Sequence, residues 1–178
     1  GQGETVQIRK IAQPANFNNV SAIYLSDGRI LFTSDRPRDG STRLYPQLDE
    51  YETQATVSGI YVMNADGSGQ ERLTNNTLSD TYPEWSPDGT KIMFSSVRPP
   101  KLPAIYLMNA DGSNPRRLTT SPGYDGGPFF SPDGQRIIWR RFDDTGVNAD
   151  VYTMKLDGSD VQRLTEFGAM SWAPYYHP

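Results

Sequence analysis

Three carboxylates stand close together in one stretch of the sequence and could bind a charged partner. Asp49, Glu50 and Glu52 lie in YPQLDEYE, next to Tyr45 and Tyr51. Carboxylate oxygens bind calcium or basic groups, although a calcium site needs about six or more oxygens. The stretch therefore predicts a loop that binds a cation or a partner's basic patch. The alternative is a solvated loop anchored by its tyrosines.

Two aspartates, Asp80 and Asp125, occupy equivalent places, each three residues before a proline. Asn19 and Ser171 match these places elsewhere in the chain. If the segments that follow are strands lining a channel, the four side chains would ring its mouth and could contact a ligand. The alternative is that they cap turns or accept backbone hydrogen bonds, as Asp and Asn commonly do.

The sequence gives little support for a catalytic centre. His177 is the single histidine and lies one residue from the end of the sequence, at a position where other units have Ser, so neither a multi-histidine metal site nor a Ser-His-Asp arrangement is expected. The lack of cysteine excludes disulfides and cysteine-ligated zinc or iron–sulfur clusters. Paired carboxylates acting as general acid and base stay open as an alternative. No cofactor is predicted, and a bound cation such as calcium is also left open.

Charge and hydropathy exclude two classes of partner. The net charge is −4 and no basic stripe is present, so the sequence lacks the phosphate-neutralising groups on which nucleic-acid binding depends. No apolar run approaches the roughly 18 residues that a membrane span requires. The expected partner is therefore a protein or a small ligand.

A repeat must position all of these residues. IYVMNADGSGQERLT at 60–74 recurs, with substitutions, at 105–119 and 151–165. PEWSPDGTKIMFSS at 83–96 recurs at 128–141, and a degenerate copy occupies 22–34. The Asp-Gly-Ser aspartates Asp66, Asp111 and Asp157 are 45 and 46 residues apart. A period of this length predicts a repeat architecture.

Each unit is predicted to contain four short antiparallel strands. Pro-Asp-Gly and Asp-Gly-Ser are tight-turn sequences, and alternating apolar residues flank them. Four strands in 40 to 50 residues, repeated, predict an all-β protein, a β-propeller built from four-stranded blades. A β-solenoid is the alternative. Trp85, Phe130 and Tyr176 should pack between blades, whereas the turn aspartates, such as Asp88 and Asp133, should be structural.

The two motifs together resemble the WD-like propeller repeat of the translocation protein TolB and its secreted bacterial relatives. The resemblance covers 22–178 and implies a periplasmic or extracellular location in a bacterium. The first copy departs from the pattern, with Leu-Ser-Asp-Gly at 25–28 where the family has Ser-Pro-Asp-Gly. The family's rings have six to eight blades, which implies that this chain supplies part of a ring.

The repeat boundaries divide the chain into five segments. Residues 1–19 contain the outer strand of a preceding blade at about 6–12, and 20–74 form a blade with a long insertion at 37–59. Residues 75–119 and 120–165 form two further blades, and 166–178 begin another. About three and a half blades are therefore expected. The rest of the ring would come from the same protein or from another copy.

The two faces of the predicted ring differ. The turn face carries the uniform Pro-Asp-Gly and Asp-Gly-Ser turns, whereas the loop face carries the other connections, which vary in length and charge. Binding surfaces are usually formed by such loops. The loop face should therefore bind the partner or ligand, through Arg36, Asp49, Glu50, Tyr51, Glu52, Asp80 and Asp125.

Function is predicted to be non-catalytic binding through the loop face and the central channel. The alternative is a propeller that forms part of an enzyme whose remaining parts lie outside this chain. FTSDR at 32–36 resembles oligogalacturonate lyases, and GRILFTSDRP at 28–37 resembles the hydrazine synthase alpha subunit. Prolyl-oligopeptidase-like peptidases also carry similar repeats, but they need a separate hydrolase domain.

Overall fold

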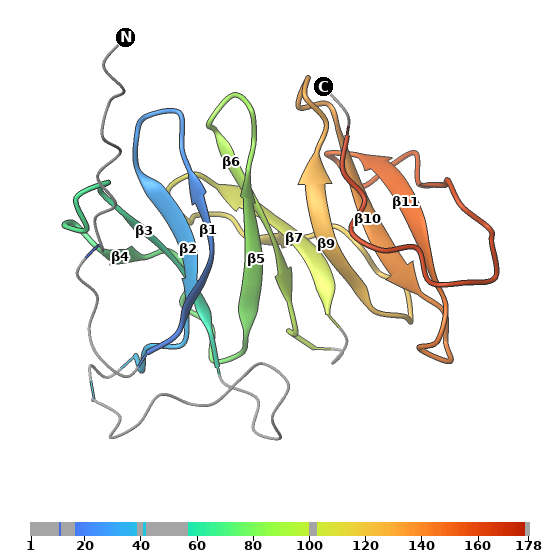
Figure 1. Ribbon diagram of the computed structural model, residues 1–178, viewed down its shortest axis with the longest axis horizontal. Coiled ribbons are helices and arrows are strands. Elements are labelled where there is room, and N and C mark those ends of the chain that lie inside the picture. The colour runs from blue at the N-terminus through green and yellow to red at the C-terminus, as the bar shows by residue number, and fades with distance from the viewer. Residues whose placement is uncertain (1–10, 12–16, 39–40, 42–56, 100–102, 177–178) are drawn as a thin grey trace, which may run out of the picture.

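Three antiparallel sheets of four strands each stand side by side in the computed structural model (Figure 1). The structure describes residues 11, 17–38, 41, 57–99 and 103–176. These residues form strands and turns without a helix. The predicted all-β fold of four-stranded propeller blades is therefore confirmed. No helix in the described part is long and apolar enough to cross a membrane.

Each sheet takes its strands from consecutive sequence, in the order of the chain. Blade one contains β1 (Asn19–Tyr24), β2 (Ile30–Ser34), β3 (Gly59–Met63) and β4 (Glu71–Arg72). Blade two contains β5 (Asp80–Trp85), β6 (Lys91–Ser96), β7 (Ala104–Asn109) and β8 (Arg116–Arg117). Blade three contains β9 (Asp125–Phe130), β10 (Arg136–Phe142), β11 (Ala149–Lys155) and β12 (Gln162–Arg163).

Repeated turns reverse the chain between the first and second strands, at the upper edge in Figure 1. Asp88 accepts hydrogen bonds from the Ser86 hydroxyl at 2.6 Å and from the Thr90 amide at 3.0 Å. Asp133 accepts the equivalent bonds in blade three, from Ser131 at 2.5 Å and Gln135 at 3.0 Å. The predicted structural role of these turn aspartates is confirmed.

Apolar side chains fill the two spaces between blades. Leu31 and Ile60 of blade one meet Ile92 and Phe94 of blade two in one core, and Trp85 packs against its margin. In the second core, Met93 and Ile105 of blade two meet Trp139 and Ile137 of blade three, with Phe130 buried among them. Trp85 and Phe130 thus pack between blades, as predicted from the repeat.

The first strand of each blade contains a β-bulge. The register between the first and second strands slips by one residue in all three blades. Ser21, Tyr82 and Gly127 stand at equivalent bulge positions with φ of 52°, 51° and 60°. A non-glycine residue at positive φ is uncommon. Because positive φ recurs at this position in each blade, the bulge is a regular feature of the repeat. Ala173 has a similar φ of 46° in the segment after blade three.

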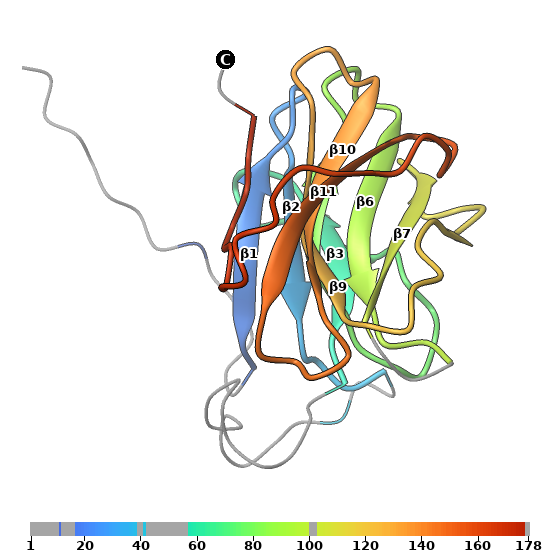
Figure 2. The same ribbon diagram turned by 90° about the vertical axis from the view of Figure 1, so that its right-hand side faces the viewer.

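That last segment runs along blade three, and Figure 2 shows it in red crossing β10 and β11. The Ser171 amide donates to the Ala149 carbonyl at 2.8 Å, and the hydroxyls of Tyr176 and Thr153 are 3.0 Å apart. The next blade covers Leu73 and Leu118, whereas their equivalent Leu164 is 51% exposed. Completion of the ring by further blades stays a prediction.

Candidate functional site

Asp80 lies buried at the start of β5, and its carboxylate is held by an arginine. Its Oδ2 lies 3.2 Å from Nη2 of Arg98 and also accepts a hydrogen bond from the Asn76 amide. Arg98 in turn lies over the rings of Phe94 and Tyr106, with its guanidinium carbon 4.9 Å from the Tyr106 centroid. Asp80 is therefore fixed by partners on its own blade.

Asp125 takes the same place in blade three. Its Oδ1 accepts hydrogen bonds from Trp139 Nε1 and Arg141 Nε, both at 2.7 Å, and Oδ2 accepts one from Ser121. Arg141 lies over Tyr152, 4.6 Å from the ring centroid. Both aspartates accept hydrogen bonds while buried, but the donors are side chains rather than the backbone groups that the structural alternative expected. A contact between either one and a ligand stays a prediction.

Arg36 repeats this arrangement in blade one with a neutral partner. Its guanidinium lies over Phe32 and Tyr61, at 5.4 Å and 5.3 Å from their centroids. Nη2 donates to Asn19 Oδ1 at 3.1 Å, and Nη1 donates to Gln70. Burial lowers the pKa of Arg36 from its usual value. The other predicted binding residues, Asp49, Glu50, Tyr51 and Glu52, lie outside the described residues.

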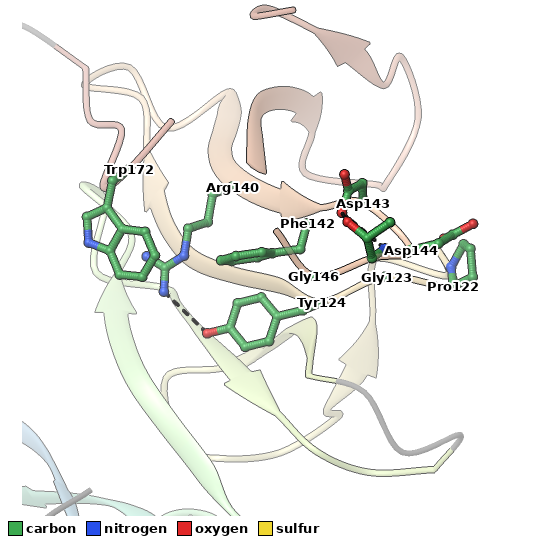
Figure 3. A pocket seen from close by; sticks show the side chains of 10 residues that line it. Pro122, Gly123, Tyr124, Arg140, Phe142, Asp143, Asp144, Gly146 and Trp172 are labelled. Carbon is green, nitrogen blue, oxygen red and sulfur yellow. Dashed lines mark hydrogen bonds between the residues drawn. The ribbon is translucent and has the colours of Figure 1, made fainter. Parts of the chain in front are cut away.

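A cavity of about 490 Å³ opens on the loop face of blade three (Figure 3). Its walls come from the β8–β9 connection, strand β10, the β10–β11 loop and the segment after β12. The lining residues are Pro122, Gly123, Tyr124, Arg140, Phe142, Asp143, Asp144, Thr145, Gly146 and Trp172. The loop face thus contains a pocket as well as the blade connections.

Aromatic rings and one arginine form one end of this pocket. The Phe142 ring meets Tyr124 and Trp172 edge-to-face, at centroid distances of 5.2 Å and 6.2 Å. Arg140 lies against Trp172 with its guanidinium carbon 4.0 Å from the ring centroid, and its Nη2 is 3.3 Å from the Tyr124 hydroxyl. Figure 3 shows the guanidinium between the Trp172 and Tyr124 rings.

The opposite end of the pocket is acidic. Asp143 accepts hydrogen bonds from the Thr145 hydroxyl at 2.6 Å and the Asn148 amide at 2.9 Å. The Thr145 hydroxyl, with help from Asn148, lowers the pKa of Asp143 to about 2. Asp144 is exposed beside it. The pocket therefore joins a cationic aromatic end to an anionic end.

Sequence reasoning did not identify the pocket residues, although the repeat contains a signal for one of them. The register of the second and third strands aligns Arg140 with Thr33 and Ser95, so an arginine replaces a small hydroxyl residue. Sequence reasoning also missed Glu84, whose pKa is raised to about 7 by burial. No group of three His, Cys, Asp or Glu residues suited to a metal ion occurs within the described ranges.

Two solved TolB structures are similar to this chain. The structure of putative TolB from Agrobacterium tumefaciens matches with a TM-score of 0.66 and 26% identity, over 83% of this chain and 46% of that one. TolB from Acinetobacter baumannii matches with a TM-score of 0.64 and 24% identity, over 87% of this chain and 34% of that one. The chain has a TolB-like propeller fold. No family model matches the sequence.

The same fold also occurs in an enzyme. An oligogalacturonate lyase in complex with manganese matches with a TM-score of 0.54 and 18% identity, over 80% of this chain and 35% of that one. At this identity the likeness shows the fold alone. The chain spans less than half the length of each of these three proteins.

Proposed function

We propose that this chain is a non-catalytic propeller scaffold that binds a protein or a small ligand through its loop face. The observation that carries the proposal is the cavity of about 490 Å³, which combines aromatic walls with a buried arginine and an acidic rim. Largely apolar cavities with a few placed polar groups are the usual form of small-molecule sites.

The two faces support this choice by their different use of polar groups. On the turn face, Asp88 and Asp133 accept hydrogen bonds within their own turns. On the loop face, Arg140 and Asp144 line an open cavity. A ligand can therefore meet charged groups on the loop face without breaking a turn.

The wider setting is also a proposal. Similarity to TolB at 26% identity supports a periplasmic or extracellular bacterial location and a protein partner. Asp49, Glu50 and Glu52 would then add negative charge to the same face. The oligogalacturonate lyase shares the fold alone, and no feature of the described residues favours a reaction on this chain over binding.

The experiment that tests the proposal is a binding screen with residue-level detection. The ¹⁵N-labelled protein is mixed with a library of small acids, amides, amines and short peptides, and amide shifts are followed by NMR. Binders should shift Gly123 and Gly146 on the loop face and leave Gly89 and Gly134 on the turn face unchanged. Binders that shift only the turn-face glycines, or a library without binders, would contradict the proposal.

A further inference from the structure

Arg140 is a buried cation without an acidic partner among the described residues. Its residue is 9% exposed, and Nε is buried with no hydrogen-bond acceptor. In the part of the chain that the structure describes, its hydrogen bond goes to the neutral Tyr124 hydroxyl, and no carboxylate pairs with it. A buried charge is costly unless it is paired and hydrogen-bonded. An anion placed beside this guanidinium would supply the negative charge that the described residues do not provide.

Two glycines make room for the guanidinium and its neighbour. A Cβ on Gly127 would lie 2.8 Å from Nη1 of Arg140, and a Cβ on Gly126 would lie 2.5 Å from the Tyr124 ring. The equivalent bulge residue is Ser21 in blade one and Tyr82 in blade two. The space around Arg140 is therefore particular to blade three.

The walls beside Arg140 suit an apolar group. Trp172 is 60% exposed, and its ring is held edge-to-face by Phe142. Tyr124 closes the other side of the guanidinium. Exposed aromatic faces contribute large apolar contact areas with little loss of side-chain freedom. An apolar body attached to the anion would cover them.

The acidic end limits the charge of the ligand. Asp143 and Asp144 line the same cavity, and both repel a second negative charge. A dicarboxylate or a phosphate dianion would bring excess charge toward them. A single carboxylate satisfies Arg140, and an arginine can bind its two oxygens in parallel.

We propose that this pocket binds a monocarboxylate with an aromatic or apolar body, seating the carboxylate on Arg140 and the body against Trp172 and Phe142. This inference rests on the proposed binding function and names its ligand class. The same chemistry is found in a small aromatic acid and in the C-terminal residue of a peptide.

The experiment compares carboxylates with their neutral amides. N-acetylphenylalanine and its amide are titrated into the ¹⁵N-labelled protein, and the Trp172 indole N–H shift is followed. The acid should bind at least about tenfold more tightly, because only it forms the charge-assisted pair. 3-Phenylpropionate and Gly-Gly-Phe with a free C-terminus are run in parallel, and the tighter of the two shows whether a small acid or a peptide terminus is preferred.

Substitutions of Arg140 and Trp172 test whether these two residues cause the preference for the acid over the amide. Arg140→Met should abolish the difference between acid and amide, whereas Arg29→Met, the same change at an exposed turn-face arginine, should preserve it. Trp172→Ala should weaken both ligands without affecting folding, since that side chain is largely exposed. Urea unfolding confirms that each variant is folded.

Three results would overturn the inference: equal affinity for acid and amide, a preference that survives in Arg140→Met, or no acid binding at millimolar concentration. If neutral compounds shift Gly123 and Gly146 while acids show no advantage, the loop-face function stands and the ligand class is wrong. If no compound shifts the loop face, the proposed function fails with it.

Discussion

Arg140 and Arg141 are neighbours on β10, yet their hydrogen-bond partners differ. Arg141 lies over Trp139 and Tyr152 and pairs with the buried carboxylate of Asp125. Arg140, whose side chain points to the other side of the strand, also lies against aromatic rings but bonds to a phenol hydroxyl. Stacking on rings is thus common to both arginines, and the acidic partner distinguishes them.

The contrast separates the arginines that bond to the start of a first strand from the one that lines a cavity. Arg36, Arg98 and Arg141 each bond to the residue that begins the first strand of their own blade, namely Asn19, Asp80 and Asp125. These contacts recur because they hold the strand in place. Arg140 has no counterpart in the other two blades, and its position faces a cavity. An arginine that does not bond to the start of a first strand is therefore a better indicator of a site than one that does.

The largest expected effect comes from breaking the paired side of the comparison. Asp125→Ala should lower the free energy of unfolding by about 3–5 kcal/mol, because it leaves Arg141 without its carboxylate and Trp139 Nε1 without its acceptor. Urea unfolding followed by tryptophan fluorescence measures this. Asp144→Ala, at an exposed carboxylate, is the control and should change stability little. A loss below 1 kcal/mol for Asp125→Ala would mean that the pair is not structural.

A second prediction concerns Glu84, a half-buried carboxylate on β5. Burial raises the pKa of Glu84 to about 7 in the folded state, so the folded protein binds a proton that the unfolded chain has released. The protonated Glu84 therefore contributes to the free energy of unfolding. This stabilisation is complete below the unfolded pKa and is lost as pH rises to about 7, and it amounts to up to about 3 kcal/mol. Glu84→Gln should flatten the stability profile in that window. An unchanged slope between wild type and variant would show that Glu84 titrates normally.

A smaller effect is expected from one hydrogen bond within the paired cluster. Trp139→Phe keeps a buried ring over which Arg141 can lie but removes the indole donor to Asp125. Because the acceptor is charged, the loss should be about 1–3 kcal/mol. Thermal and urea unfolding measure it. In an Asp125→Asn background the same substitution should cost less, and equal costs in both backgrounds would contradict the assignment.

The smallest effect should come from the unpaired arginine. Arg140→Met removes a buried charge that has no acidic partner in the described part of the chain, while keeping an apolar side chain of similar length. Stability should stay within about 1 kcal/mol of wild type or rise, since replacing an uncompensated buried charge by an apolar group is often neutral or favourable. A loss comparable to that of Asp125→Ala would show that Arg140 is structural and would remove the contrast with Arg141.

Local sequence predicted the strands and turns because their determinants are local. Asp88 and Asp133 bond to residues within two positions, and the repeat supplies independent copies of each turn. The strand-entrance residues Asp80 and Asp125 were also identified from their spacing, but spacing alone did not decide between structural and binding roles. Their contacts with Arg98 and Arg141 form only once β5 pairs with β6 and β9 with β10.

The pocket could not be predicted because its residues converge from distant segments. Tyr124 precedes β9, Arg140 lies on β10 and Trp172 follows β12, so their meeting depends on how the last segment runs along blade three. Within the sequence, Arg140 reads as one of two adjacent charged residues. The repeat aligns Arg140 with Ser95, but it aligns Arg141 with Ser96 in the same way, so the sequence does not distinguish the two arginines.

The β-bulge of the first strand has a consequence for which side chains share a side of the sheet. Asp80 and Trp85 are five positions apart, so in an uninterrupted strand they would point in opposite directions. The bulge instead places them opposite Ser96 and Ile92, which are four positions apart on β6. Both side chains therefore face blade one.

The bulge thus determines on which side of the sheet the side chains that follow it lie. Asp125 and Phe130 show the same result in blade three, opposite Arg141 and Ile137. Removing a single residue from the bulge would restore simple alternation and send either the aspartate or the aromatic to the wrong side. Because of the residue at positive φ, Tyr82 or Gly127, the strand contributes its aspartate to a buried ion pair and its aromatic residue to an apolar core on the same side of the sheet.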